Sequence, residues 1–131
     1  MSAPFFWSEL VVYGSIEDLT QWKEAHLLET SPGSVILNFN ASVPMPAELY
    51  DTWEPRMTRS LSLKRLYGAD GWLEWRLQNW GVSTEGMEAR IVQSGPTWFK
   101  VEFKTFGGPP DRWLERVMSG SPSMSFAMSP K

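Results

Sequence analysis

The residues best suited to binding chemistry form a basic and aromatic stretch near the middle of the chain. Four bases fall within ten residues and a tryptophan precedes them: Trp53, Arg56, Arg59, Lys64 and Arg65. Cationic side chains beside aromatic rings can hold phosphates and stack nucleic-acid bases, or they can meet an acidic protein surface. A solvated helix face is the structural alternative. We take this stretch as the candidate binding site.

Residues for catalysis are sparse. His26 is the only histidine, and the neighbouring Glu24 and Glu29 are typical of a solvated helix, so we expect no metal site. A catalytic triad would have to use His26, and the chain has no Gly-x-Ser-x-Gly motif. Glu17 and Asp18 suit the first turn of a helix. A hydrolase that uses two carboxylates stays open, although no pair of residues points to it. We expect a protein that is not an enzyme and has no cofactor.

Composition limits the class of protein. The 131 residues suit a single domain, 1–131, and charged residues at 21% with aromatic residues at 14% are typical of a globular protein. The absence of cysteine excludes disulfides and zinc–thiolate sites. No apolar run approaches the roughly 18 residues of a membrane span, and no signal peptide is evident. We therefore expect a cytoplasmic protein that does not contact membranes.

The charge is unevenly distributed along the chain. Residues 1–54 contain eight acids and one base, whereas residues 55–131 contain seven acids and eleven bases, and the net charge is −3. This asymmetry suggests one acidic and one basic face. Folding could equally mix the two halves in space.

Hydrophobic periodicity predicts the order of the elements. We expect a largely buried strand at 5–13, a helix at 15–27 with Ile16, Leu19 and Trp22 on its inner face, and a strand at 35–40. A short helical piece is expected at 47–53, then a helix or loop at 54–67 with Met57, Leu61 and Leu66 facing inward. A hairpin follows at 86–93 and 97–106, with a helix at 111–118 and an edge strand at 124–128.

The prediction for fold class is α+β, with a ferredoxin-like antiparallel sheet, helices on one face and a helical insertion at about 46–80. One strand is surplus to that plan. On the strand at 97–106, Phe99, Val101 and Phe103 alternate with Lys100, Glu102 and Lys104, which indicates one buried and one solvated face. Met124 and Met128, on the expected edge strand, could support a homodimer.

A tryptophan-rich helix is expected between Gly68 and Gly81. Asp70 is the predicted N-cap and Gly81 the predicted stop. Leu73, Leu77 and Trp80 share one helical face, which Trp72 and Trp75 widen. The helix is interpreted as part of the core, with an exposed aromatic platform as the alternative.

Several stretches, taken in order, resemble the YubB-type ferredoxin-like domain family of uncharacterised phage- and plasmid-borne proteins. The similar residues are Phe39-Asn40, Pro44-Met45-Pro46, Asn79-Trp80-Gly81, and Thr105 with Pro109-Pro110. Ser83-Thr84 and Gly107-Gly108 depart from the family, which usually has a Lys-Trp and a Trp at these places. The resemblance implies a ferredoxin-like fold and an origin in a mobile element.

The functional hypothesis follows from this origin and from the missing catalytic groups. We expect a phage or plasmid accessory protein in the host cytoplasm, namely a counter-defence inhibitor that blocks a host immune protein or complex. The alternative is a module that binds nucleic acid or nucleotides, with Trp98 or Phe99 as the stacking platform.

Overall fold

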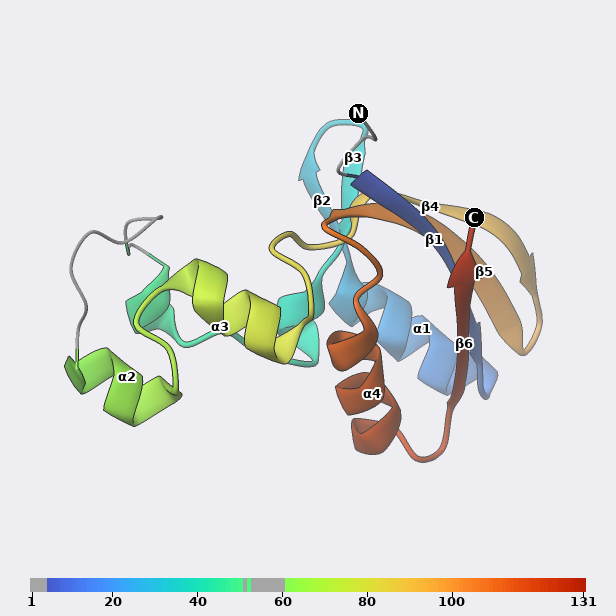
Figure 1. The fold of residues 1–131 in the computed structure, drawn as a ribbon. Helices are drawn as coiled ribbons and strands as arrows, with labels where there is room; N and C mark the ends of the chain where they lie inside the picture. Colours follow the sequence, from blue (N-terminus) through green and yellow to red (C-terminus); the bar gives the residue numbers. More distant parts are fainter. Residues whose placement is uncertain (1–4, 51, 53–60) are drawn as a thin grey trace.

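The computed structural model describes residues 5–50, 52 and 61–131. Its main sheet is antiparallel with the strand order β4-β5-β1-β6 (Figure 1). The strands are β1 (Phe5–Tyr13), β4 (Met87–Gly95), β5 (Trp98–Phe106) and β6 (Ser125–Pro130). The first strand lies between the second strand of the hairpin and the last strand, as in the split βαβ plan. The predicted α+β class, the hairpin and the edge position of the last strand are confirmed.

Two helices, α1 (Ile16–His26) and α4 (Asp111–Gly120), lie on the same side of this sheet (Figure 1). From α1, the Trp22 ring lies 5.8 Å from Phe99 and 5.9 Å from Phe126, measured between ring centroids. From α4, Trp113 and Val117 are buried. The prediction for Ile16 was wrong: it is exposed, because it starts the helix beyond the edge of this packing.

The surplus strand belongs to a separate hairpin. Strand β2 (Leu27–Ser31) pairs with β3 (Ser34–Leu37), so the helix predicted to reach residue 27 ends at His26. The strand predicted at 35–40 ends early, because the Asn38 side chain accepts a hydrogen bond from the Asn40 N–H and starts the 3₁₀ turn η1 (Phe39–Ala41). Two backbone hydrogen bonds between Leu37 and Gly86 join this hairpin to the start of β4.

The insertion contains the 3₁₀ turn η2 (Ala47–Leu49) and the helices α2 (Leu61–Tyr67) and α3 (Trp72–Asn79), and both helices project away from the sheet (Figure 1). Leu61 and Leu66 do not face inward as predicted; both are exposed. Leu63 and Tyr67, one helical turn apart, pack against the core instead. Met57 lies outside the described residues.

The buried face of α3 also differs from the prediction. Trp75 and Trp80 are buried and their rings meet edge to face at 5.8 Å, whereas Leu77 is 47% exposed. Tryptophan buries more surface than leucine, so the aromatic side chains determine which face turns inward. Asp70 is not the N-cap. The helix starts after Gly71, and the backbone N–H of Trp72 donates to the Thr52 hydroxyl at 3.0 Å.

The first strand is buried on one face only. Ser8, Leu10 and Val12 point to the helices, whereas Phe5 and Tyr13 are 43% and 46% exposed. The prediction of a largely buried strand was therefore wrong, because no helix of the described chain covers the second face. We call this second face the open face. It comprises alternate residues of β1 and β5, with Arg90 and Lys131 beside them: Phe5, Trp7, Glu9, Val11, Tyr13, Trp98, Lys100, Glu102, Lys104 and Phe106.

Candidate functional site

Aromatic pairs mark both ends of the open face. Phe5 lies opposite Phe106 in the β1–β5 register, with the rings edge to face at 5.6 Å. Tyr13 lies opposite Trp98 at the other end of the same two strands. Since a strand rises about 3.4 Å per residue, the two pairs lie roughly 27 Å apart. Phe5, Tyr13 and Phe106 are each more than two-fifths exposed, so both pairs are available to a partner.

Between the aromatic pairs, the open face is charged, and its charges pair with one another. Lys100 contacts Glu9 at 3.6 Å, and Lys104 contacts Glu88. Arg90 and Lys131 both contact Glu102, at 2.8 Å and 2.7 Å. The basic side chains of this face therefore already face carboxylates.

Glu102 is an ionised structural group. Its side chain is almost fully covered. The hydrogen bond from Lys131, together with that from Arg90, holds the pKa of its carboxyl below the ordinary value, although burial acts in the opposite direction. A carboxylate held ionised in this way accepts hydrogen bonds and is a poor proton donor. It therefore organises the two bases and does not suit acid–base catalysis.

The rings suggested as a stacking platform differ in access. Phe99 is fully buried, so it cannot stack a base and that part of the prediction was wrong. Trp98 lies on the open face, as expected for a platform. Trp7, which the sequence did not single out, has the Lys131 and Lys104 ammonium groups 5.0 Å and 5.9 Å from its ring centroid. A ligand would have to displace these lysines to stack on Trp7.

The basic stretch predicted as the binding site is only partly described. Trp53, Arg56 and Arg59 lie outside the described residues. Lys64, on α2, pairs with Glu74 of α3 at 2.8 Å. Arg65 is exposed on the same helix. Lys64 therefore joins two helices of the insertion, and the stretch as a binding site stays a prediction.

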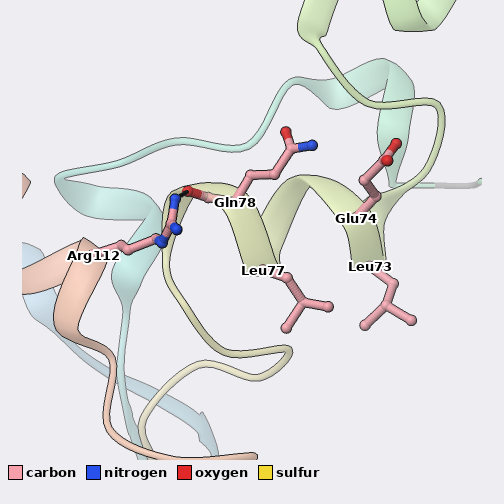
Figure 2. Close-up of a pocket in the computed structure, with 5 residues that line it drawn as sticks. All are labelled: Leu73, Glu74, Leu77, Gln78 and Arg112. Atoms are coloured by element: carbon pink, nitrogen blue, oxygen red, sulfur yellow. Dashed lines mark hydrogen bonds between the residues drawn. The ribbon is translucent and has the colours of Figure 1, made fainter.

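A hollow of about 400 Å³ lies where α3 meets the start of α4 (Figure 2). Leu73 and Leu77 point the same way, and Glu74 and Gln78 lie on the other side of the helix (Figure 2). The Arg112 Nη1 donates to the backbone carbonyl of Gln78 at 3.0 Å. The Glu74 carboxylate forms an ion pair with Lys64, and the Gln78 side chain donates a hydrogen bond to the Gly68 carbonyl. These polar contacts hold the helices together, and the hollow contains no reactive group.

The lone histidine is part of the core. His26 is buried, and its ring stacks on that of Trp22 with the ring centroids 3.8 Å apart. Its Nδ1 lies 2.9 Å from the Trp22 carbonyl oxygen, and its Nε2 contacts the Ser42 hydroxyl. Burial lowers its pKa. Among the described residues, no cluster of three or more histidine, aspartate or glutamate side chains could hold a metal ion.

Arg76 is a half-buried ionisable group, which the sequence did not predict. Its guanidinium carbon lies 5.0 Å from the Trp72 ring centroid and 4.8 Å from that of Trp80, and Nη1 donates to the Ser83 carbonyl at 2.9 Å. Burial lowers its pKa. Arg76 therefore fixes the loop after α3 against two tryptophans.

The motif residues at the end of α3 have structural roles. Trp80 is buried, and its indole N–H donates to the Val43 carbonyl at 2.9 Å. The Asn79 amide donates to the Trp75 carbonyl and accepts from Arg116 at 2.9 Å. These contacts hold the Pro-x-Pro segment and α4 against α3.

The second group of motif residues holds the link from β5 to α4. The Thr105 hydroxyl donates to the Gly108 carbonyl, and the Pro109 and Pro110 carbonyls accept the N–H groups of Asp111 and Leu114. Thr105 is buried. Thr105, Pro109 and Pro110 therefore stabilise the loop between β5 and α4.

Comparison of the chain with protein-family models, with curated proteins and with solved structures finds no match. The resemblance to YubB-type proteins rests on its motif residues. Within the described ranges, no helix has both the length and the apolar character needed to cross a bilayer.

Proposed function

We propose that this chain is a non-enzymatic binding protein that acts by occupying a surface of another protein with its open face. The observation that carries this proposal is the placement of two aromatic pairs at the ends of the open face, on either side of internally paired charges. Phe5 contacts Phe106 at one end, and Tyr13 lies opposite Trp98 at the other. Aromatic and arginine side chains are enriched where proteins bind one another.

The charge of the open face favours a protein partner over a nucleic acid. Phosphate binding needs bases that can release counterions, and its strength grows with their number. Here Lys100, Lys104 and Arg90 each contact a carboxylate of the protein itself. A protein surface can cover such a paired arrangement without meeting a large excess of either charge.

The resemblance to phage- and plasmid-borne proteins supports a more specific partner. A mobile element gains from blocking host immunity, so we propose that the partner is a host immune protein or complex and that the chain is a counter-defence inhibitor in the host cytoplasm. The mechanism is steric, because a bound domain excludes other partners from the surface it covers. The homodimer along the edge of β6 stays a prediction, and light scattering would test it.

Affinity purification from host lysate at low salt, followed by mass spectrometry, tests this function. We expect a specific host protein, and we expect a Tyr13→Ser, Phe106→Ser double variant to bind it at least about 30-fold more weakly, as for interface residues that each contribute about 1–2 kcal/mol. Met118→Ser is the matched control, since Met118 is similarly exposed but lies on α4. Recovery of no host protein, or equal loss in the control, would contradict the proposal.

The exposed aromatic residues on the two central strands favour one other function, binding of single-stranded nucleic acid or nucleotides. Ferredoxin-like sheets that bind RNA stack bases at such positions. Titration of tryptophan fluorescence with single-stranded RNA, single-stranded DNA and cyclic nucleotides tests it. The absence of quenching at low salt would eliminate this alternative.

A further inference from the structure

A groove of about 710 Å³ lies beside the open face, between the β2–β3 hairpin and the main sheet. Trp7, Arg90 and Glu102 line it from the sheet, and residues 33–36 line it from the hairpin. The volume is in the range of sites that hold ligands or peptide side chains. The groove exists because β3 joins β4 only through the Leu37–Gly86 bridge.

The backbone of β4 is distorted where it borders this groove. Glu88 has φ 50°, and it is the only non-glycine residue of the described chain with a positive φ. The β4–β5 register shifts between Met87 and Arg90, which identifies a β-bulge. Bulges redirect side chains, and strained backbone conformations concentrate at binding sites. The bulge positions Arg90 at the groove.

The network of ion pairs beside the groove has one more base than it has acids. Glu102 is shared by Arg90 and Lys131, and Glu88 contacts Lys104, so three bases face two acids. Arg90 contacts Glu102 only through Nε and Nη2, and its side chain is 71% exposed. A guanidinium has five N–H donors in a planar fork. The outer edge of the fork is therefore available for two parallel hydrogen bonds to a second carboxylate.

We infer that this groove binds an acidic segment of the partner protein, whose aspartate or glutamate carboxylate pairs with Arg90. The carboxylate balances the excess charge around Glu102. An apolar neighbour in the same segment packs against Trp7 and Val35, which line the groove on opposite sides. This inference rests on the proposed function, since it specifies how the partner is recognised.

NMR titration of the full chain with capped peptides tests the inference. One five-residue peptide carries a central aspartate flanked by valines, and the other carries asparagine instead. We expect the aspartate peptide to shift the Arg90 Nε and Trp7 indole signals with millimolar affinity, and to bind about 10-fold more tightly than the asparagine peptide. Equal binding of the two peptides, or no shift at these signals, would overturn the inference.

Variants separate the groove from diffuse electrostatics. Arg90→Gln should lower the affinity for the aspartate peptide about 10-fold, whereas Lys100→Gln, which changes a base of the open face outside the groove, should change it less than 2-fold. Ser34→Trp narrows the groove from the hairpin and leaves the ion pairs in place, so it should also abolish binding even if Arg90→Gln unfolds. Equal effects of the two charge variants would contradict a specific site.

Inorganic phosphate provides a further arm, because an arginine fork can also bind phosphate. Phosphate at one-tenth of the peptide concentration should not displace the aspartate peptide. Full displacement of the peptide at that concentration would identify a phosphate site instead. The outcome is independent of the affinity purification. A captured host protein with no peptide binding rejects only this groove, and peptide binding with no captured protein rejects only the proposed function.

Discussion

At the scale of single residues, Gly81 controls how α3 meets α4. It has φ 85°, and a Cβ placed there would lie 3.5 Å from the Arg112 backbone nitrogen. We expect Gly81→Ala to lower the free energy of unfolding by about 1–2 kcal/mol, because a side chain disfavours this backbone conformation. Urea denaturation measures the change.

Gly120→Ala is the control for this prediction. Gly120 is the last residue of α4, its φ lies outside the left-handed region, and an added Cβ would meet no atom within 4 Å. This variant should be neutral or slightly stabilising. A destabilisation equal to that of Gly81→Ala would show that backbone strain is not the cause.

His26 should make stability depend on pH. Burial lowers its pKa in the folded protein. Below the ordinary value of about 6.5, the unfolded chain therefore binds a proton that the folded chain does not, and stability falls as the pH falls. The stabilisation lost through His26 at low pH is fully restored above about pH 7.5.

Thermal unfolding between pH 5 and pH 7.5 checks this prediction. The Tm of the native chain should decrease toward pH 5, and His26→Gln should have a flatter profile over the same range. Glu102 does not confuse the result, since its pKa is lowered and its contribution is lost only below the ordinary carboxyl range. An unchanged slope in His26→Gln would refute the role given to His26.

Residue-level prediction succeeded where a pattern repeats and failed where burial depends on distant segments. Phe99, Val101 and Phe103 are buried and Lys100 is on the solvated face, as their alternation predicts. Glu102, predicted to be solvated as well, is buried. The burial of His26 could not be predicted from such a pattern, because the residues that cover it, Ser42 and Trp113, come from later parts of the chain.

At the scale of elements, α3 shows how side-chain size can decide between two helical faces. Both sets of residues have helical spacing, so the sequence alone could not choose between the leucines and the tryptophans. We expect Trp75→Ala to cost about 3–5 kcal/mol of unfolding free energy, and Leu77→Gln to change it by less than about 0.5 kcal/mol. Chemical denaturation of the two variants gives both values. A larger loss of unfolding free energy in Leu77→Gln than in Trp75→Ala would show that the leucine face is the buried one, as the sequence predicted.

The boundary between α1 and β2 illustrates a second limit of local reasoning. Leu27 has the spacing of a helical residue, yet it pairs with Leu37 in a hairpin. Pairing ten residues away is a tertiary contact that periodicity does not encode. The same limit applies to the groove, since Arg90 and Trp7 are brought together only by the sheet.

At the scale of the whole molecule, the strand order was predictable because the split βαβ plan has few alternatives. The distribution of charge over the folded molecule was not predictable from the sequence. Within the main sheet, the acidic first half is not separated from the basic second half, since β1 lies between β5 and β6 and Glu9 pairs with Lys100. Folding mixes the two halves at this sheet, which was the second interpretation of the charge asymmetry.

This mixing predicts a weak dependence of partner binding on salt. Because the bases of the open face are paired, few counterions should be released on association. We expect the Kd for the captured partner to rise less than about 10-fold between 50 mM and 200 mM salt. A nucleic-acid ligand with six to ten phosphate contacts would lose about 10³–10⁵-fold over that range. Calorimetry or surface plasmon resonance at several salt concentrations distinguishes a protein partner from a nucleic-acid ligand.

The position of Lys131 affects how the protein should be labelled. Its backbone N–H donates to the Trp7 carbonyl at 3.0 Å, and its side chain reaches Glu102. A purification tag or fluorophore fused after Lys131 would therefore emerge beside the open face and compete with the partner. The loop between α4 and β6, around Ser121 and Ser123, lies at the other end of β6. That loop adjoins Tyr13, which lies opposite Ser125, so a label there would also obstruct the partner. A label on the exposed side chain of Glu115, on α4 at the other side of the sheet, would report binding without obstructing it.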